Sequence, residues 1–124
     1  MAEIEYLDFH DIRLICEVII PGFVIRDQGL LLSALERPQT QLYGVDVYPE
    51  FDFKVAALMH SLARNHSLID GNKRLAWSAS RIFCLMNKRD ILLSVNQAEK
   101  LVVGVAAGKF EVNQISERLR IEIQ

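Results

Sequence analysis

Apolar residues recur along most of the chain at the three- and four-residue spacing of amphipathic helices. A first helix is predicted from a cap at Asp8 to about Ile20, where the Pro-Gly pair at 21–22 ends it. Its apolar face consists of Ile12, Ile15, Cys16 and Ile19. A short second helix is predicted over residues 29–36, and Pro38 prevents its continuation.

The two longest predicted helices lie in the middle of the chain and flank a short loop. The third is expected over residues 51–65, and the next position of its apolar stripe is His66. That stripe consists of Val55, Met59 and Leu62. The fourth is expected over residues 72–86 and is apolar on most sides, which is typical of a central helix. Its main stripe consists of Leu75, Ala79, Ile82 and Met86.

The remaining segments are less regular. Residues 37–50 contain two prolines and a glycine with no clear period, which predicts a long loop. A turn is expected at residues 87–90 and a short extended piece at 91–95. Asn96 and Glu99 have the form of a capping box.

The C-terminal part is expected to be helical as well. The capped helix would end at Gly108, and a last amphipathic helix is predicted over residues 113–121. Together these elements predict an all-α fold, with one domain spanning residues 1–124.

Composition narrows the classes of function. The chain has 14 basic and 16 acidic residues and a formal charge of −2, so direct binding to nucleic acid is not expected. Cys16 and Cys84 form neither a disulfide framework nor a metal-ligand pattern, and we expect two buried apolar residues in a reducing compartment. The sequence shows no signal segment and no apolar run of membrane-spanning length, which favours a cytoplasmic protein without membrane contact.

The segment HSLIDGNKR, between the third and fourth predicted helices, combines groups that suit phosphate chemistry. Gly71 permits a backbone conformation that other residues resist, and the first amides of the next helix lack intrahelical partners. Lys73 and Arg74 place two cations in a first helical turn, which suits a bound anion. Asp70 offers an oxygen ligand for Mg²⁺, and His66 offers a base for an incoming hydroxyl. Their coincidence predicts a nucleotide-phosphate site.

This segment resembles the signature of the Fic superfamily, H-x-F-x-(D/E)-(G/A)-N-x-R, and the lysine before the last arginine is typical of its Doc ("death on curing") toxins. Residues 29–39 (GLLLSALERPQ) are similar to an early segment of Doc-type proteins. Leu68 stands where the family has phenylalanine and Ser67 where proline is frequent, and neither change removes a chemical group. The resemblance covers nearly the whole chain and implies a single-domain Fic/Doc-like helical bundle, with the motif loop before a central helix.

The resemblance implies a role for each motif residue. His66 would be the catalytic general base, and Asp70 would be the Mg²⁺ ligand. The groups that bind the phosphates of ATP would be Gly71, Asn72, Lys73 and Arg74.

The resemblance also implies a reaction. Most Fic proteins transfer AMP from ATP to a protein hydroxyl, with glycine where this chain has Lys73 and often a second arginine where it has Trp77. Doc-type proteins are thought to bind ATP reversed, which implies transfer of the γ-phosphate to a Ser or Thr hydroxyl of elongation factor Tu and arrest of translation. AMP transfer is the enzymatic alternative, and a catalytically silent binding module with the same fold is the other.

A toxin of this kind implies a partner. The family's inhibitory motif, (S/T)-x-x-x-E-(G/N), has no match in the sequence, so we expect a cognate, Phd-like antitoxin whose disordered segment folds as a helix in a groove. Residues 43–48, in the long loop, are a candidate for docking a target strand by backbone pairing.

Several other residues are expected to be structural. His10 and His60 lie outside the motif and lack a metal-ligand spacing, and Trp77 has the spacing of a core residue. Arg64 and Asn65 directly precede the motif, where they either reach the phosphate or target or face solvent.

Overall fold

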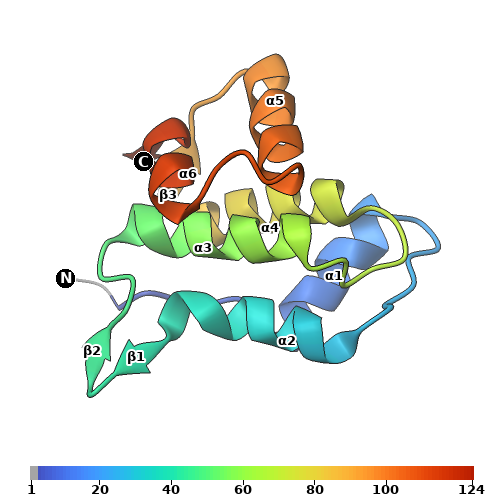
Figure 1. Cartoon of the computed structure of the whole chain (residues 1–124), viewed down its shortest axis with the longest axis horizontal. Coiled ribbons are helices and arrows are strands. Elements are labelled where there is room, and N and C mark those ends of the chain that lie inside the picture. The colour runs from blue at the N-terminus through green and yellow to red at the C-terminus, as the bar shows by residue number, and fades with distance from the viewer. Residues whose placement is uncertain (1–2) are drawn as a thin grey trace.

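The computed structural model describes residues 3–124, and within them the chain forms six α-helices, one 3₁₀ turn and four short strands (Figure 1). The helices are α1 (Phe9–Ile19), α2 (Gln28–Glu36), α3 (Phe51–Arg64), α4 (Asn72–Met86), α5 (Val95–Ala106) and α6 (Val112–Arg118), with the 3₁₀ turn η1 (Arg37–Gln39) after α2. The strands are β1 (Gln41–Leu42), β2 (Val45–Asp46), β3 (Arg89–Ile91) and β4 (Ile121–Ile123). This mostly helical architecture confirms the predicted class. In the same range, no helix combines the length and apolarity needed to cross a membrane.

Helices α3 and α4 form the centre of the bundle. In Figure 1, α3 lies between α2 and the C-terminal pair α5 and α6, and α4 packs against α1, α3, α5 and β3. The predicted stripe of α3 is buried, with Val55, Met59 and Leu62 fully covered, whereas Ile82 and Met86 in the predicted stripe of α4 are only partly buried. Leu75 and Ala79 of α4 are fully covered as well. The loop that joins α3 to α4 is therefore held at both ends by the most enclosed elements of the fold.

A local sequence signal accounts for the start of α1. At the start of α1, the Asp8 carboxylate accepts a hydrogen bond from the Asp11 amide (2.8 Å), and the Asp11 carboxylate accepts one from the Asp8 amide (3.0 Å). This reciprocal capping satisfies two amides at the helix start. The predicted bounds of α1 to α4 agree with the observed ones to within one residue at each end.

The segment predicted as a long loop has structure of its own. Besides η1, residues 37–50 contain an antiparallel hairpin of β1 and β2, with Leu42 opposite Val45. Tyr43 and Gly44 both have positive φ (52° and 78°), as a two-residue type I′ turn requires. Strands of two residues are too short for a periodic pattern to predict them.

The predicted capping box of α5 is wrong by two residues. Ser94, not Asn96, caps the helix: its hydroxyl accepts from the Gln97 amide (3.2 Å), and the Gln97 side chain accepts from the Ser94 amide (2.9 Å). The two pairs have the same spacing, so the sequence pattern did not separate them. The helix ends at Ala106, and Gly108 follows it with a φ of 82°.

The secondary structure at the C-terminus also differs from the prediction. Helix α6 stops at Arg118, and residues 121–123 form β4 instead of continuing the helix. Strand β4 pairs with β3 in antiparallel register, with Ile121 opposite Ile91. The C-terminal segment thus crosses back to the end of α4.

Both cysteines belong to the core. Cys16 and Cys84 have almost no exposed surface, and burial raises the pKa of the Cys16 thiol to about 11 and that of Cys84 to about 12. Both are free thiols. The predicted role as small buried apolar residues is confirmed.

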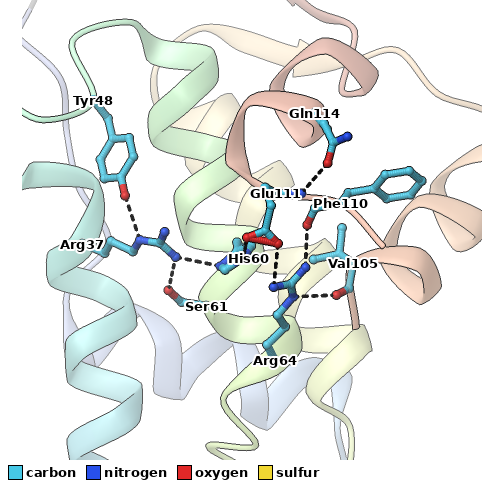
Figure 2. Close-up of polar contacts among 9 residues, drawn as sticks. All are labelled: Arg37, Tyr48, His60, Ser61, Arg64, Val105, Phe110, Glu111 and Gln114. Atoms are coloured by element: carbon cyan, nitrogen blue, oxygen red, sulfur yellow. Dashed lines mark hydrogen bonds and ion pairs between the residues drawn. The ribbon is translucent and has the colours of Figure 1, made fainter. Parts of the chain in front are cut away.

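A polar network follows the outer side of α3 (Figure 2). Arg37 donates hydrogen bonds to the Tyr48 hydroxyl (3.0 Å), to Nδ1 of His60 (2.8 Å) and to the Ser61 hydroxyl (3.0 Å). Since Arg37 can only donate, Nδ1 of His60 is the acceptor and the neutral ring carries its proton on Nε2. The network therefore ties η1 and the segment after the hairpin to α3.

The same network reaches the C-terminal helices. Nε2 of His60 faces the Glu111 carboxylate at 3.5 Å, and Arg64 forms an ion pair with Glu111 at 3.0 Å. The Arg64 guanidinium also donates to the carbonyls of Val105 (2.9 Å) and Phe110 (2.6 Å). These contacts confirm a structural role for His60 and give Arg64 the same role.

Candidate functional site

The loop between α3 and α4 makes two sharp changes of backbone direction. His66 has a φ of 52°, which is uncommon for a residue with a Cβ atom, and Gly71 has a φ of 90°. The first turn ends the path of α3, so His66 leaves the buried stripe and is exposed. The second starts α4. The loop thus presents His66 and Asp70 outside the core although both neighbouring helices are buried.

An extended segment ahead of α2 supports the loop through main-chain hydrogen bonds. Ile25 and Leu68 form an antiparallel β-bridge. The Ile69 amide donates to the Val24 carbonyl (3.0 Å), and the amides of Arg26 and Asp27 both donate to the Ser67 carbonyl (2.8 and 3.0 Å). Residues 24–27 and 67–69 therefore form a narrow two-stranded ribbon.

The Arg26 side chain adds a second support that the sequence did not reveal. Its Nε donates to the His66 carbonyl at 2.6 Å, and its Nη2 lies 3.4 Å from the Asn65 carbonyl. These bonds join positions 40 and 39 residues apart, so no local pattern points to them. They hold the backbone of His66 in its left-handed conformation, which makes Arg26 a positioning residue.

The Asn72 side chain is hydrogen-bonded to the backbone of the loop. Its side-chain oxygen accepts from the Leu68 amide (3.0 Å), and its amide nitrogen donates to the Leu68 carbonyl (2.9 Å). Leu68 itself is 1% exposed, so the leucine anchors the loop as expected of an apolar residue at this position. Asn72 is the first residue of α4, and Gly71 occupies the cap position. The Asn72 side chain therefore shapes the loop instead of capping the helix.

The N-terminus of α4 is open toward the loop. Gly71 supplies no side-chain cap, so the first amides of a 15-residue helix keep their donor capacity. The Asp70 carboxylate accepts from the Gly71 amide at 2.9 Å, which fixes it beside this helix end. A Cβ atom on residue 71 would lie 2.9 Å from the Ile20 side chain, so the residue that follows α1 packs tightly behind the turn. Free amides at a helix N-terminus favour a negatively charged ligand.

A cavity of about 460 Å³ opens over this helix end and is named the motif cavity. It brings together five of the six predicted site residues: His66, Asp70, Gly71, Asn72 and Lys73. Helix α5 forms its opposite wall, through Val103 and the residues near its end.

The sixth predicted residue, Arg74, borders a neighbouring cavity between α4 and α5. This α4–α5 cavity has a volume of about 490 Å³ and shares Lys73 and Val103 with the motif cavity. One Nη of Arg74 donates to the Ile19 carbonyl at 3.2 Å, while its side chain remains exposed. Lys73 therefore lines both cavities, whereas Arg74 lines only the second.

The hairpin lies away from this site. Helix α3 begins shortly after β2 and is about 20 Å long, so the hairpin and the motif loop lie at opposite ends of it (Figure 1). Tyr43 is 98% exposed at the tip. Docking of a target strand by residues 43–48 stays a prediction, and the hairpin that would do it lies at the other end of α3 from the motif loop.

The sequence is similar to those of known proteins. The sequence model of the Fic/DOC family matches residues 4–84, which include the whole motif. The chain is also 42% identical over 118 residues to the protein named "Toxin Doc" of Mycolicibacterium smegmatis, an alignment that covers 93% of this chain and 91% of that protein. Since the match includes the helices on both sides of the loop as well as the loop itself, this chain belongs to the Fic/DOC family.

Proposed function

We propose that this protein is the toxin of a toxin–antitoxin module and a protein-modifying transferase that uses ATP. Its reaction is transfer of the γ-phosphate to a Ser or Thr hydroxyl of a target protein, with elongation factor Tu as the target and arrest of translation as the result. The resemblance to Doc toxins and the similarity to a protein named Toxin Doc support the toxin role. The chemistry rests on the motif cavity.

One observation carries the proposal: an exposed histidine, a carboxylate and a lysine surround an uncapped helix N-terminus in one cavity. The free amides of α4 and Lys73 provide positive charge for a phosphoryl group. His66 lines the same cavity and is exposed, so an incoming hydroxyl can reach it. The motif cavity can thus hold the acceptor hydroxyl, the phosphoryl group and the base next to one another.

The proposed reaction forms one bond to phosphorus, breaks another and transfers one proton. The target hydroxyl oxygen forms a bond to the γ-phosphorus, and the bond between that phosphorus and the β–γ bridging oxygen breaks, so ADP leaves. The hydroxyl proton passes to the imidazole of His66. Catalysis then consists mostly of positioning and of charge neutralisation around the transferred group.

Asp70 fits a Mg²⁺ ion that is shared with the phosphates. Mg²⁺ in nucleotide sites is commonly held by one or two carboxylates together with phosphate oxygens and water. Asp70 is an exposed carboxylate in the motif cavity, and its bond to the Gly71 amide keeps it there. The ion would neutralise phosphate charge. Residues 3–124 contain no cluster of three or more His, Cys, Asp or Glu side chains that could hold a metal ion by themselves.

Lys73 favours γ-phosphate transfer over AMP transfer. Its side chain is exposed in the motif cavity at the position where AMP-transferring relatives carry glycine. A long cation there occupies space next to the helix end and neutralises a phosphate that carries more charge than an internal one. The terminal phosphate of ATP fits that description.

Mass spectrometry of elongation factor Tu after incubation with the protein, ATP and Mg²⁺ tests target and reaction together. We expect a mass increase of one phosphate group on a Ser or Thr, and radioactive label to be transferred from γ-labelled but not from α-labelled ATP. The His66→Ala variant should transfer neither. Transfer of label from the α-position alone would replace the proposal with AMP transfer, and growth arrest by His66→Ala equal to that of the parent would indicate a silent binding module.

An antitoxin is the expected partner. The sequence has no match to the family's inhibitory motif, so restraint must come from another chain. Co-expression with the neighbouring open reading frame should restore growth of cells that produce the protein. Growth arrest that persists with every flanking gene supplied would contradict this part of the proposal.

A further inference from the structure

The α4–α5 cavity has a charged entrance and an apolar interior. Lys73 and Arg74, at the start of α4, provide this charge, and Lys73 also lines the motif cavity. Among residues 3–124, neither cation belongs to an ion pair, so both keep charge for a ligand. The interior is lined by Trp77 and by aliphatic residues of α5 and of the segment after β3.

The lining of α4 is ordered along the helix. Lys73, Trp77 and Arg81 follow one another at four-residue intervals, so they lie on one face and advance about 6 Å per step. At the far end the Arg81 guanidinium is paired with the Asp90 carboxylate (3.1 and 3.3 Å), which neutralises its charge. Positive charge for an anion is therefore concentrated at the motif end of the stripe.

Trp77 is the aromatic wall of this cavity. It was predicted to be a core residue, and it does pack against the core, but it is only partly buried and its remaining surface lines the cavity. Glu99, an exposed carboxylate of α5, lines the same space and can accept hydrogen bonds from an amino group. A flat ring with exocyclic donors suits these two neighbours.

We propose that the α4–α5 cavity binds the base of the nucleotide whose phosphates lie at the motif loop, with the purine ring against Trp77. The inference rests on the proposed use of ATP and adds the residues that select a nucleotide over other phosphates. The volume of about 490 Å³ lies in the usual range for small-molecule sites. In this pose the phosphate tail runs from Trp77 past Lys73 to Gly71, so the phosphate farthest from the base reaches the side of the motif cavity that holds His66.

Trp77 gives a direct readout, since it is the chain's only tryptophan. ATP and ADP, titrated into the full chain with Mg²⁺, should change its fluorescence in a saturable manner. Inorganic tripolyphosphate should compete with ATP at the motif but leave most of the emission unchanged. Binding of ATP without any change in emission would overturn the proposal.

Two substitutions separate stacking from folding. Trp77→Leu removes the ring and keeps an apolar side chain, and calorimetry should show ATP binding weakened about 10- to 100-fold, the range expected for loss of stacking on a base. Trp77→Phe keeps an aromatic face and should remain within a few-fold of the parent. Tripolyphosphate should bind all three proteins alike. Equal weakening of ATP and tripolyphosphate in Trp77→Leu would mean that the residue only supports the fold.

The outcomes distinguish this inference from the proposed function. A saturable Trp77 signal without transfer of label from ATP keeps the base site and removes the transferase. Transfer of the γ-label without a change in Trp77 fluorescence keeps the transferase and removes the base site. A Trp77 signal that responds to a partner protein but not to ATP assigns the cavity to that partner and also overturns the inference.

Discussion

Replacement of Asn72 by alanine should destabilise the protein through the motif loop alone. The two hydrogen bonds between the Asn72 amide and the backbone of Leu68 are 3.0 and 2.9 Å long. Each contributes about 0.5–1.5 kcal/mol net, so their loss lowers the free energy of unfolding by about 1–3 kcal/mol. Leu68 is 1% exposed, and water has poor access to the amide and carbonyl that would be left without partners. We therefore expect a value in the upper half of that range.

Urea denaturation followed by circular dichroism measures this effect, and two further variants sharpen it. Asn72→Asp keeps the shape and the acceptor but places a carboxylate oxygen against the Leu68 carbonyl, so it should be at least as unstable as the alanine variant near neutral pH. Protonation at low pH restores a donor and should narrow that gap. Asn96→Ala, at an exposed position of α5, should change the stability by no more than about 0.5 kcal/mol. Equal stabilities of Asn72→Ala and Asn96→Ala would refute the role given to the amide.

Three other properties follow from the structure. Arg26→Ala removes the bonds to the His66 and Asn65 carbonyls. Transfer activity should therefore fall at least several-fold, while the affinity for ATP, measured by calorimetry, should change little. An equal loss of activity and affinity would contradict a positioning role. Burial and, after it, the nearby charges of Arg64 and Arg37 lower the pKa of His60. The fold therefore favours the neutral ring, and the stability should decrease as the pH falls below about 6.5, the ordinary pKa of a histidine. His60→Gln should lose that component and the exposed His10→Gln should keep it, and identical pH profiles for all three proteins would argue against the assignment. Cys16 and Cys84 should resist a thiol reagent at pH 8 in the folded protein and react after unfolding, because burial raises both thiol pKa values to about 11 and 12; rapid labelling of the native chain would show that the core opens.

The sequence predicted the central helices well and the short pairings poorly. Helices α1 to α4 carry apolar stripes over several turns and clear end signals, such as Asp8 at the start of α1. The hairpin and β4 have strands of two and three residues, which leave no measurable period. The box at Ser94 and Gln97 was missed because a second pair of suitable residues lies two positions later.

The sequence predicted the chemical groups of the motif but not the geometry of its loop. The types and spacing of His66, Asp70 and Lys73 were enough to predict a phosphate site, and the fold places all three in one cavity. The positive φ of His66 was not predicted, because left-handed conformations are uncommon for every residue type except glycine, even for those such as histidine in which they are enriched. Arg26 reaches the loop from 40 residues away, a distance along the chain that only tertiary structure bridges.

The ribbon between residues 24–27 and the motif loop has a consequence for how the protein can vary. Its bonds use carbonyl and amide groups that every residue type except proline supplies equally. The loop is therefore insensitive to which side chain stands at Val24, and exchanges there leave each bond in place. It is sensitive to spacing, because deletion of one residue between Gly22 and the start of α2 would shift the pairing by one position and turn the opposite side chains toward the loop. Variation at Val24 is therefore tolerated as substitution, whereas Arg26 is also fixed by the bonds of its side chain, and insertion or deletion is excluded along the whole segment.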